Sequence, residues 1–296
     1  LALSLHQRGT NVSGCDAFTP YYDPELKLER AHELEALGIE IDPCDLRDIP
    51  EKGYTHIAHL AAQPGVRYSL ENPMLYAETN VCGMVSVVEL ARKTGAHLIY
   101  ASSSSVYGRN TKRPFSEDDI VTSPASLYAA TKLADEHIAS AYHHLYGIHV
   151  TGLRFFTVYG PYGRPDMAYF SFARAIEEGK AIRLFNEGQV YRDFTYIDDV
   201  VAGTVAALDA ALPCEVVNLG KGKAEPVGDL VRALERGLGR TAHLEKAPMQ
   251  QGDVVATEAD VAKAERLLGY SPKISLDEGI SRFVAWYRTR RPTAAR

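Results

Sequence analysis

Apolar and polar positions along the chain follow two different periods in turn. Short apolar or alternating runs, which indicate strands, lie near residues 11–16, 39–42, 55–60, 97–101, 150–156, 182–185 and 216–219. Segments with helical periodicity lie near residues 1–8, 25–37, 74–94, 126–146, 168–178, 197–211, 227–238, 260–268 and 276–289. Because strands that alternate with helices usually pair in parallel, the pattern predicts an α/β fold with a doubly wound parallel sheet.

Several predicted strands end directly at residues that carry functional chemistry. Asp16 follows the first of them and Asp45 comes just after the second. The third leads into residues 60–63, and the fourth leads into Ser102–Ser105. Ligands of doubly wound sheets bind at the carboxyl ends of the strands. We therefore expect these four places to meet at one binding edge.

A tyrosine and a lysine stand four residues apart on the helix predicted for residues 126–146. On a helix, Tyr128 and Lys132 lie one turn apart on the same face. An ammonium near a tyrosine hydroxyl favours the phenolate, which is a usable general base near neutral pH. A serine of the run Ser102–Ser105 could hold the substrate oxygen. The constellation predicts proton removal from an alcohol, with a nicotinamide accepting the hydride.

The composition limits the classes of partner. A net charge of −6 over 296 residues leaves no basic footprint for nucleic acid. No apolar run approaches the ~20 residues that cross a bilayer. Cys15, Cys44, Cys82 and Cys214 are scattered, so we expect buried or partly buried free thiols in a reducing cytoplasm. The histidines lack metal-ligand spacing, and we assign no metal.

The chain contains no glycine-rich phosphate loop of the kind that opens a dinucleotide-binding fold. It begins inside a predicted helix, without the preceding strand and turn. Two interpretations compete: an N-terminally incomplete chain that lacks its first strand and glycine-rich loop, or a protein that never bound a dinucleotide. Under the first, we expect residues 1–296 alone to bind a nicotinamide cofactor poorly and to aggregate through unpaired strand edges.

Ordered segments along nearly the whole chain carry a family resemblance. They read DAFTPYYDPELK at 16–27, HLAAQPGVRYS at 59–69, ASSSSVYG at 101–108, YAATK at 128–132, RFFTVYGPYGRPDMA at 154–168 and YRDFTYIDD at 191–199. The chain resembles the extended short-chain dehydrogenase/reductase family, in particular its nucleotide-sugar epimerases that act on UDP-glucuronate at C4. A Y-x-x-x-K pair alone is weak, but the ordered set together is strong.

The serine run distinguishes between branches of that family. Related 4,6-dehydratases typically carry Thr-Asp-Glu in this loop, and UDP-glucuronate decarboxylases carry a glutamate there. This chain has Ser103, Ser104 and Ser105, with no carboxylate to act on the C5–C6 end of the sugar. The resemblance therefore implies epimerisation through a 4-keto sugar, with NAD as the cofactor.

The resemblance also implies roles for individual residues. Tyr128, Lys132 and Ser103 would be catalytic. The residues that would hold NAD are Asp16, Asp45, Leu46, Leu60, Ala61, Ala62, Gln63 and Asn80, together with Tyr128 and Lys132. The residues that would contact the UDP-sugar are Ser103, Ser104, Thr157, Arg164, Arg192, Asp253 and Arg67. Structural roles stay open for some of these: Asp45 could cap a turn, and Arg192 could pair with Asp193 or Asp199.

The resemblance implies a domain organisation as well. An NAD-binding Rossmann domain would span residues 1–160, with strands near 194–221 returning to it, and a smaller UDP-sugar-binding domain would span 161–296. A cytoplasmic homodimer built on two long helices is the implied assembly. Two alternatives stay open: a 4-epimerase of UDP-glucose or UDP-N-acetylglucosamine, and a catalytically inactive binding or scaffold protein.

Overall fold

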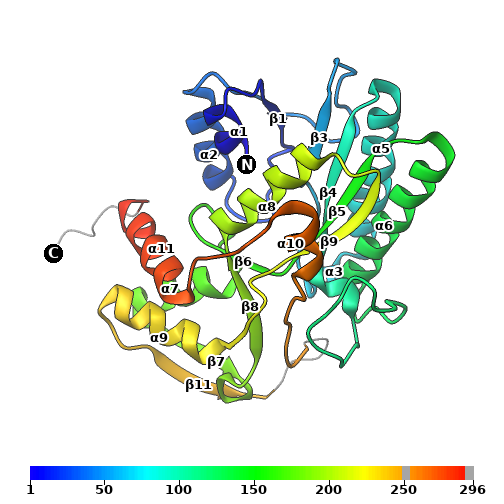
Figure 1. The fold of residues 1–296 in the computed structure, drawn as a ribbon. Helices are drawn as coiled ribbons and strands as arrows, with labels where there is room; N and C mark the ends of the chain where they lie inside the picture. The colour runs from blue at the N-terminus through cyan, green and yellow to red at the C-terminus, as the bar shows by residue number, and fades with distance from the viewer. Residues whose placement is uncertain (249–253, 291–296) are drawn as a thin grey trace.

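A four-stranded parallel sheet forms the centre of the fold. The structure is a computed structural model that describes residues 1–248 and 254–290. The strand order is β3–β4–β5–β9, formed by His56–His59, His97–Ser103, Val150–Phe155 and Cys214–Leu219. All three pairings are parallel, with Ile99 opposite both Ala58 and Thr151. The predicted doubly wound α/β architecture is confirmed (Figure 1).

Helices cover both faces of this sheet. Helices α5 (Gly83–Thr94) and α6 (Leu127–Tyr146) pack on one face, and α8 (Ile197–Ala210) and α10 (Ala262–Leu268) pack on the other (Figure 1). Successive side chains of a strand point to opposite faces. In β4, Leu98 and Tyr100 accordingly join the core beneath α5 and α6, whereas Ile99 joins the core beneath α8 and α10. This double burial explains why the strand has a continuous apolar run.

The first strands form a separate parallel pair. β1 (Ser13–Cys15) lies beside β2 (Glu40–Asp42), and α2 (Glu25–Glu35) connects them after the short α1 (Ala2–Gln7). Among the residues described, β1 pairs only with β2, and β3 pairs only with β4. The carboxyl ends of β1 and β2 lie together, which brings the segments after Cys15 and Asp42 side by side.

The long helix predicted for residues 74–94 is interrupted. After α3 (Tyr68–Glu71), the chain forms α4 (Pro73–Tyr76), a π-helical segment (Ala77–Cys82) and then α5. The widened turn contains the buried Asn80, whose side chain bonds to two other elements. The predicted helix is thus present over residues 73–94, and its α-helical hydrogen bonding is interrupted by a π-turn that tertiary hydrogen bonds hold.

The C-terminal half forms its own core on two small sheets. One is the three-stranded sheet β10–β8–β6, formed by Ala224–Pro226, Tyr191–Tyr196 and Thr157–Tyr159. The other pairs β11 (His243–Ala247) with β7 (Ala181–Phe185). The helices around this core are α7 (Ala168–Glu178), α9 (Val227–Leu238) and α11 (Leu276–Arg290) (Figure 1). Strands near residues 194–221 were expected to return to the domain formed by the first half of the chain. Of these, β9 joins the central sheet, whereas β8 pairs with β6 and β10.

No helix in the described part of the chain is long and apolar enough to cross a membrane.

Candidate functional site

The tyrosine and the lysine lie in the first turns of α6. Ser126 caps this helix by accepting the Ala129 N–H at 3.1 Å. Tyr128 is half-buried, and its ring stands edge-on to Tyr76 with 6.3 Å between the ring centroids. The Lys132 side chain is 2% exposed. Helical spacing therefore places a buried ammonium one turn after a partly accessible phenol.

Lys132 has a buried acidic partner that the sequence analysis did not identify. Its Nζ lies 3.1 Å from Oδ2 of Asp135, which is 1% exposed. Burial raises the pKa of Asp135 to about 6, and the Lys132 ammonium opposes that rise. His59 of β3 faces the same ammonium, and burial first, then this charge, lower the pKa of His59 to about 3. The spacing of Lys132 and Asp135 on one helix was the available signal.

Asn80 joins the segment after β3 to α6. Its Oδ1 accepts the Gln63 N–H at 2.7 Å, and its Nδ2 donates to the Gln63 carbonyl at 3.2 Å. The same Nδ2 donates to Oγ1 of Thr131 at 3.0 Å, and that hydroxyl donates to the Tyr128 carbonyl at 2.8 Å. The predicted residues Gln63 and Asn80 are thus brought together with α6.

The serine run begins where β4 ends. Ser103 has an extended backbone and caps the short 3₁₀ helix Ser104–Tyr107. Its Oγ accepts the Ser105 N–H at 3.2 Å and donates to the Ser105 hydroxyl at 3.1 Å. Ser103 and Ser104 are half-buried, and this segment packs against α6. The structure therefore places both predicted serines beside the helix that carries Tyr128.

A buried polar network holds the serine segment in place. Ser102 donates to Oε1 of Glu136 at 2.6 Å, and Arg154 binds the same carboxylate through two nitrogens at 2.9 and 2.8 Å. The Arg154 guanidinium also covers the Tyr107 ring at 4.8 Å, and Tyr107 donates to Asn218 at 2.7 Å. The sequence analysis missed these roles. An arginine inside an otherwise apolar strand was the available signal.

The two predicted strand-end carboxylates differ in their contacts. Asp16 is exposed, and its Oδ1 accepts the Phe18 N–H at 2.7 Å. Asp45 accepts the Arg47 backbone N–H at 3.0 Å and two guanidinium bonds at 2.7 and 2.9 Å. These hydrogen bonds from Arg47 hold the pKa of Asp45 below its ordinary value. Asp45 thus makes the turn-capping contacts that stood as its alternative role.

The apolar residues predicted to line the cofactor divide between core and surface. Leu46 packs against α5, where an added Cβ on Gly83 would lie 2.7 Å from its Cδ1. Leu60 is 44% exposed at the end of β3. Ala61 is exposed and Ala62 is half-buried. The segment after β3 therefore presents small or apolar side chains near α6, to which Asn80 connects it.

Among the described residues predicted to contact the substrate, Arg164 has a buried side-chain nitrogen without a hydrogen-bond partner. Its Nη2 lies 3.2 Å from the Met167 sulfur and its Nε lies 3.4 Å from Asp166, while its Nη1 is buried without a hydrogen-bond partner. Burial raises the pKa of Tyr76 to about 12, and the nearby Arg164 charge opposes that rise. Tyr76 in turn stands edge-on to Tyr128 of α6.

The remaining predicted substrate residues lie on several elements. Thr157 is half-buried at the start of β6, opposite Phe194. The Arg67 guanidinium lies 5.8 Å over the Phe185 ring, at the end of β7. Nη1 of Arg192 donates to the carbonyls of Tyr191 and Val254, each at 2.9 Å. Asp253 lies outside the described residues.

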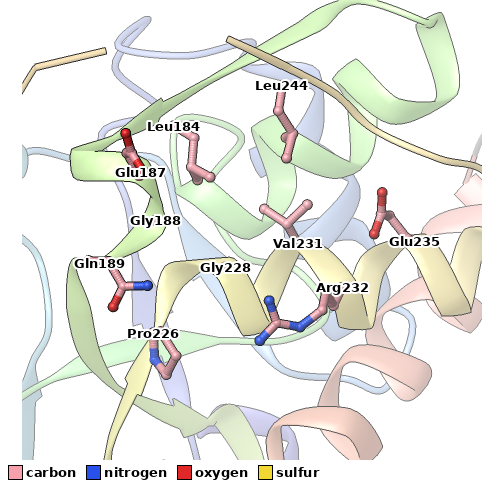
Figure 2. A pocket seen from close by; sticks show the side chains of 10 residues that line it. All are labelled: Leu184, Glu187, Gly188, Gln189, Pro226, Gly228, Val231, Arg232, Glu235 and Leu244. Carbon is pink, nitrogen blue, oxygen red and sulfur yellow. The ribbon is translucent and has the colours of Figure 1, made fainter. Parts of the chain in front are cut away.

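A separate pocket lies between α9 and the β7–β11 sheet. Figure 2 shows the side chains that line it. Its volume is about 240 Å³. Leu184, Val231 and Leu244 form its apolar part, and Glu187, Arg232 and Glu235 supply its charges. None of the predicted site residues lines it. Within residues 1–248 and 254–290, no cluster of three histidine, cysteine or acidic residues could hold a metal ion.

Comparison with known proteins places the chain among nucleotide-sugar enzymes. UDP-glucuronate 4-epimerase 4 of Arabidopsis thaliana is 48% identical, over 97% of this chain and 72% of its own length. UDP-glucuronic acid 4-epimerase from Bacillus cereus, solved with UDP-glucuronic acid and NAD, superposes with a TM-score of 0.91 at 32% identity, over 97% of this chain and 94% of that one. The NAD-bound UDP-glucose 4-epimerase of Thermus thermophilus gives 0.86 at 27% identity, over 98% and 94%.

The family model described as "NAD dependent epimerase/dehydratase family" matches residues 1–220. This match covers more than half of the chain, and the relatives at 48% and 32% identity extend over nearly all of it. The resemblance to nucleotide-sugar epimerases is confirmed. The chain belongs to the NAD-dependent epimerase/dehydratase family.

Proposed function

We propose that the protein is an NAD-dependent 4-epimerase of UDP-sugars that interconverts UDP-glucuronate and UDP-galacturonate through a 4-keto intermediate. The observation that carries the proposal is that α6, which bears Tyr128 and Lys132, packs against β4 and against the serine segment that follows it. The relatives named UDP-glucuronate 4-epimerase support the choice of substrate.

The residues at the strand ends fit a bound NAD. Asp16 offers an exposed carboxylate at the end of β1, where doubly wound folds bind the adenosine ribose hydroxyls. Ala61 and Ala62 leave the backbone after β3 open to close approach. Asn80 and Gln63 fix that backbone, and Lys132 would meet the nicotinamide ribose. Bound NAD supplies the reversible acceptance of a hydride from C4 of the sugar.

The protein's own residues handle the proton. Tyr128, as phenolate, accepts the O4 proton, and Ser103 donates a hydrogen bond to O4. The Lys132 ammonium stabilises the phenolate electrostatically. After the 4-keto sugar has turned over, the hydride returns to the opposite face of C4 and Tyr128 returns the proton to O4, so the reaction has no net oxidation.

Arginines account for the two anionic ends of the substrate. Arg192 is oriented by two backbone carbonyls and would grip the diphosphate, because a guanidinium matches phosphate geometry. The partnerless Nη1 of Arg164 would meet the glucuronate carboxylate. Ser104, Thr157 and Arg67 would complete the sugar site. Holding the carboxylate also limits its loss as carbon dioxide from the β-keto acid.

The test compares substrates on the protein expressed from its complete reading frame. With added NAD, NMR should show epimerisation of UDP-glucuronate in preference to UDP-glucose and UDP-N-acetylglucosamine. Tyr128→Phe should lower turnover by about 100-fold or more. Tyr146→Phe, on the exposed end of the same helix, is the matched control. Near-normal turnover by Tyr128→Phe, or no epimerisation of any UDP-sugar, would refute the proposal.

We also propose a homodimer. Exposed apolar side chains lie on neighbouring helices, at Leu70 of α3, Met74 of α4, Val85 of α5 and Leu145 of α6. Such groups favour association with a second copy of the chain. Light scattering coupled to size-exclusion chromatography should give twice the chain mass, and Met74→Glu with Leu145→Glu should halve it.

The proposed location is the cytoplasm, because all four cysteines are free thiols. Three of them are partly buried, as expected, but Cys82 is exposed. The net charge of −6 supports a partner set without nucleic acid. Cell fractionation tests the location.

A further inference from the structure

We propose that Cys15 and Cys44 form a dithiol site at the carboxyl ends of β1 and β2, which small-molecule disulfides oxidise to an intramolecular disulfide. Cys15 is the last residue of β1, and Cys44 follows β2 after Asp42 and Pro43. Both thiols are free and half-buried. The pairing of two strands, rather than the spacing of 29 residues in the sequence, brings them together.

The backbone holds the two cysteines against each other. Cys15 lies opposite Asp42 in the parallel register. The Asp42 carbonyl oxygen accepts both the Asp16 N–H at 3.2 Å and the Cys44 N–H at 2.9 Å. The chain thus bends back after β2. The backbone N–H groups of Cys44 and of Asp16, the residue after Cys15, both point to this one oxygen. After burial, the Cys44 thiol is the largest cause of the raised Cys15 pKa, which agrees with this convergence of the backbone.

The oxidation proceeds by two thiol–disulfide exchanges. The Cys44 thiolate attacks a small disulfide, whose S–S bond breaks and releases one thiol. Cys15 then loses its proton and attacks the Cys44 sulfur, which releases the second thiol and forms the Cys15–Cys44 bond. The two protein thiols are oxidised and the small disulfide is reduced to two thiols. Cys15 reacts second, because burial and then its contact with Cys44 raise the pKa of Cys15 to about 12.

The bridge would affect the cofactor, and this consequence rests on the proposed function. Each cysteine directly precedes a predicted adenosine-binding carboxylate, Asp16 or Asp45. To bond, the sulfur atoms of these two free thiols must approach to about 2.05 Å. That approach draws the two strand ends together and changes the spacing of the two carboxylates. We expect the oxidised protein to bind NAD at least about fivefold more weakly, and bound NAD to slow the oxidation by linkage.

The experiment uses the protein from its complete reading frame, with Cys82→Ser and Cys214→Ser to remove the other described thiols. After oxidised glutathione, the intact mass should fall by two hydrogens, and peptide mapping should find a Cys15–Cys44 linkage. When Cys15→Ser is introduced into this variant, oxidised glutathione should leave a stable glutathione adduct on Cys44. When Cys44→Ser is introduced instead, Cys15 should stay mostly unmodified. Two alkylatable thiols after oxidant, or a bridge only between two molecules, would overturn the site.

Calorimetric titration with NAD separates this proposal from the proposed function. If the bridge forms and NAD binds the reduced protein more tightly, both stand. If the bridge forms and NAD binds both forms equally, the effect on the cofactor is refuted. If the bridge forms and NAD binds neither form, the dithiol site stands and the proposed function fails. NAD binding without any bridge refutes the dithiol site alone.

Discussion

Asp135→Asn should remove a pH dependence of stability that the buried Asp135 carboxylate creates. The Asp135 pKa is raised from its ordinary 3.8 to about 6, first by burial. A carboxyl whose pKa is raised in the fold contributes stability below its unfolded pKa, and that stability is lost as the pH rises through the folded pKa. The difference between the two pKa values corresponds to about 3 kcal/mol. The wild type should lose this amount between about pH 4 and pH 7.

The asparagine variant cannot ionise at this position, so its unfolding free energy should lack that loss. Urea unfolding at several pH values would give the free energy of both proteins. The wild-type value minus the variant value should fall by about 3 kcal/mol over this range. The other groups that face the pair are Glu136 on the same helix, His59 of β3 and Tyr100 of β4. They are present in both proteins, so most of their contribution cancels in the difference.

Asp229→Asn is the matched control. Asp229 also pairs with a cation three residues later, Arg232, but on the exposed surface of α9. An exposed pair contributes under about 1 kcal/mol, so this variant should follow the wild type at every pH. Parallel curves for wild type and Asp135→Asn would refute the reasoning, because they would mean that Asp135 is not a buried, titrating carboxylate.

Three further predictions follow from buried or partnerless groups. Glu136→Gln should lower the unfolding free energy by about 3–5 kcal/mol in urea, because Arg154 loses its buried carboxylate. The pKa of His97 is lowered to about 4 by burial, so the wild type should lose stability as the pH falls below about 6.5, and His97→Gln should lose less. Arg164→Gln should raise KM about tenfold for UDP-glucuronate but little for UDP-glucose in steady-state assays, if Nη1 meets the carboxylate.

Local periodicity predicted the strands of the central sheet and also β1, β2 and β7, but not β6, β8, β10 and β11 of the smaller sheets. In β4, burial on both faces leaves a continuous apolar run that can be recognised from the sequence. By contrast, one strand was expected over residues 150–156, whereas the chain leaves the central sheet after Phe155 and enters β6 at Thr157. That change depends on pairing with β8, about 35 residues later. Periodicity within one segment carries no information about such a partner.

The same distinction applies to the candidate site. The spacing of Tyr128 and Lys132 is a property of one helix and could be predicted. The bond between Glu136 and Arg154 joins a helix to a strand, and only the fold brings these residues together. The Cys15–Cys44 contact likewise arises from the parallel register of β1 and β2.

One helix positions the candidate chemistry through polar bonds to three strands. From α6, Thr131 reaches the end of β3 through Asn80, and Glu136 reaches both Ser102 of β4 and Arg154 of β5. These contacts are buried, so they contribute to stability and fix the position of the catalytic face at the same time. Substitutions in this network should therefore lower stability and turnover together. A change in turnover without a loss of stability points instead to a residue that contacts the substrate or cofactor.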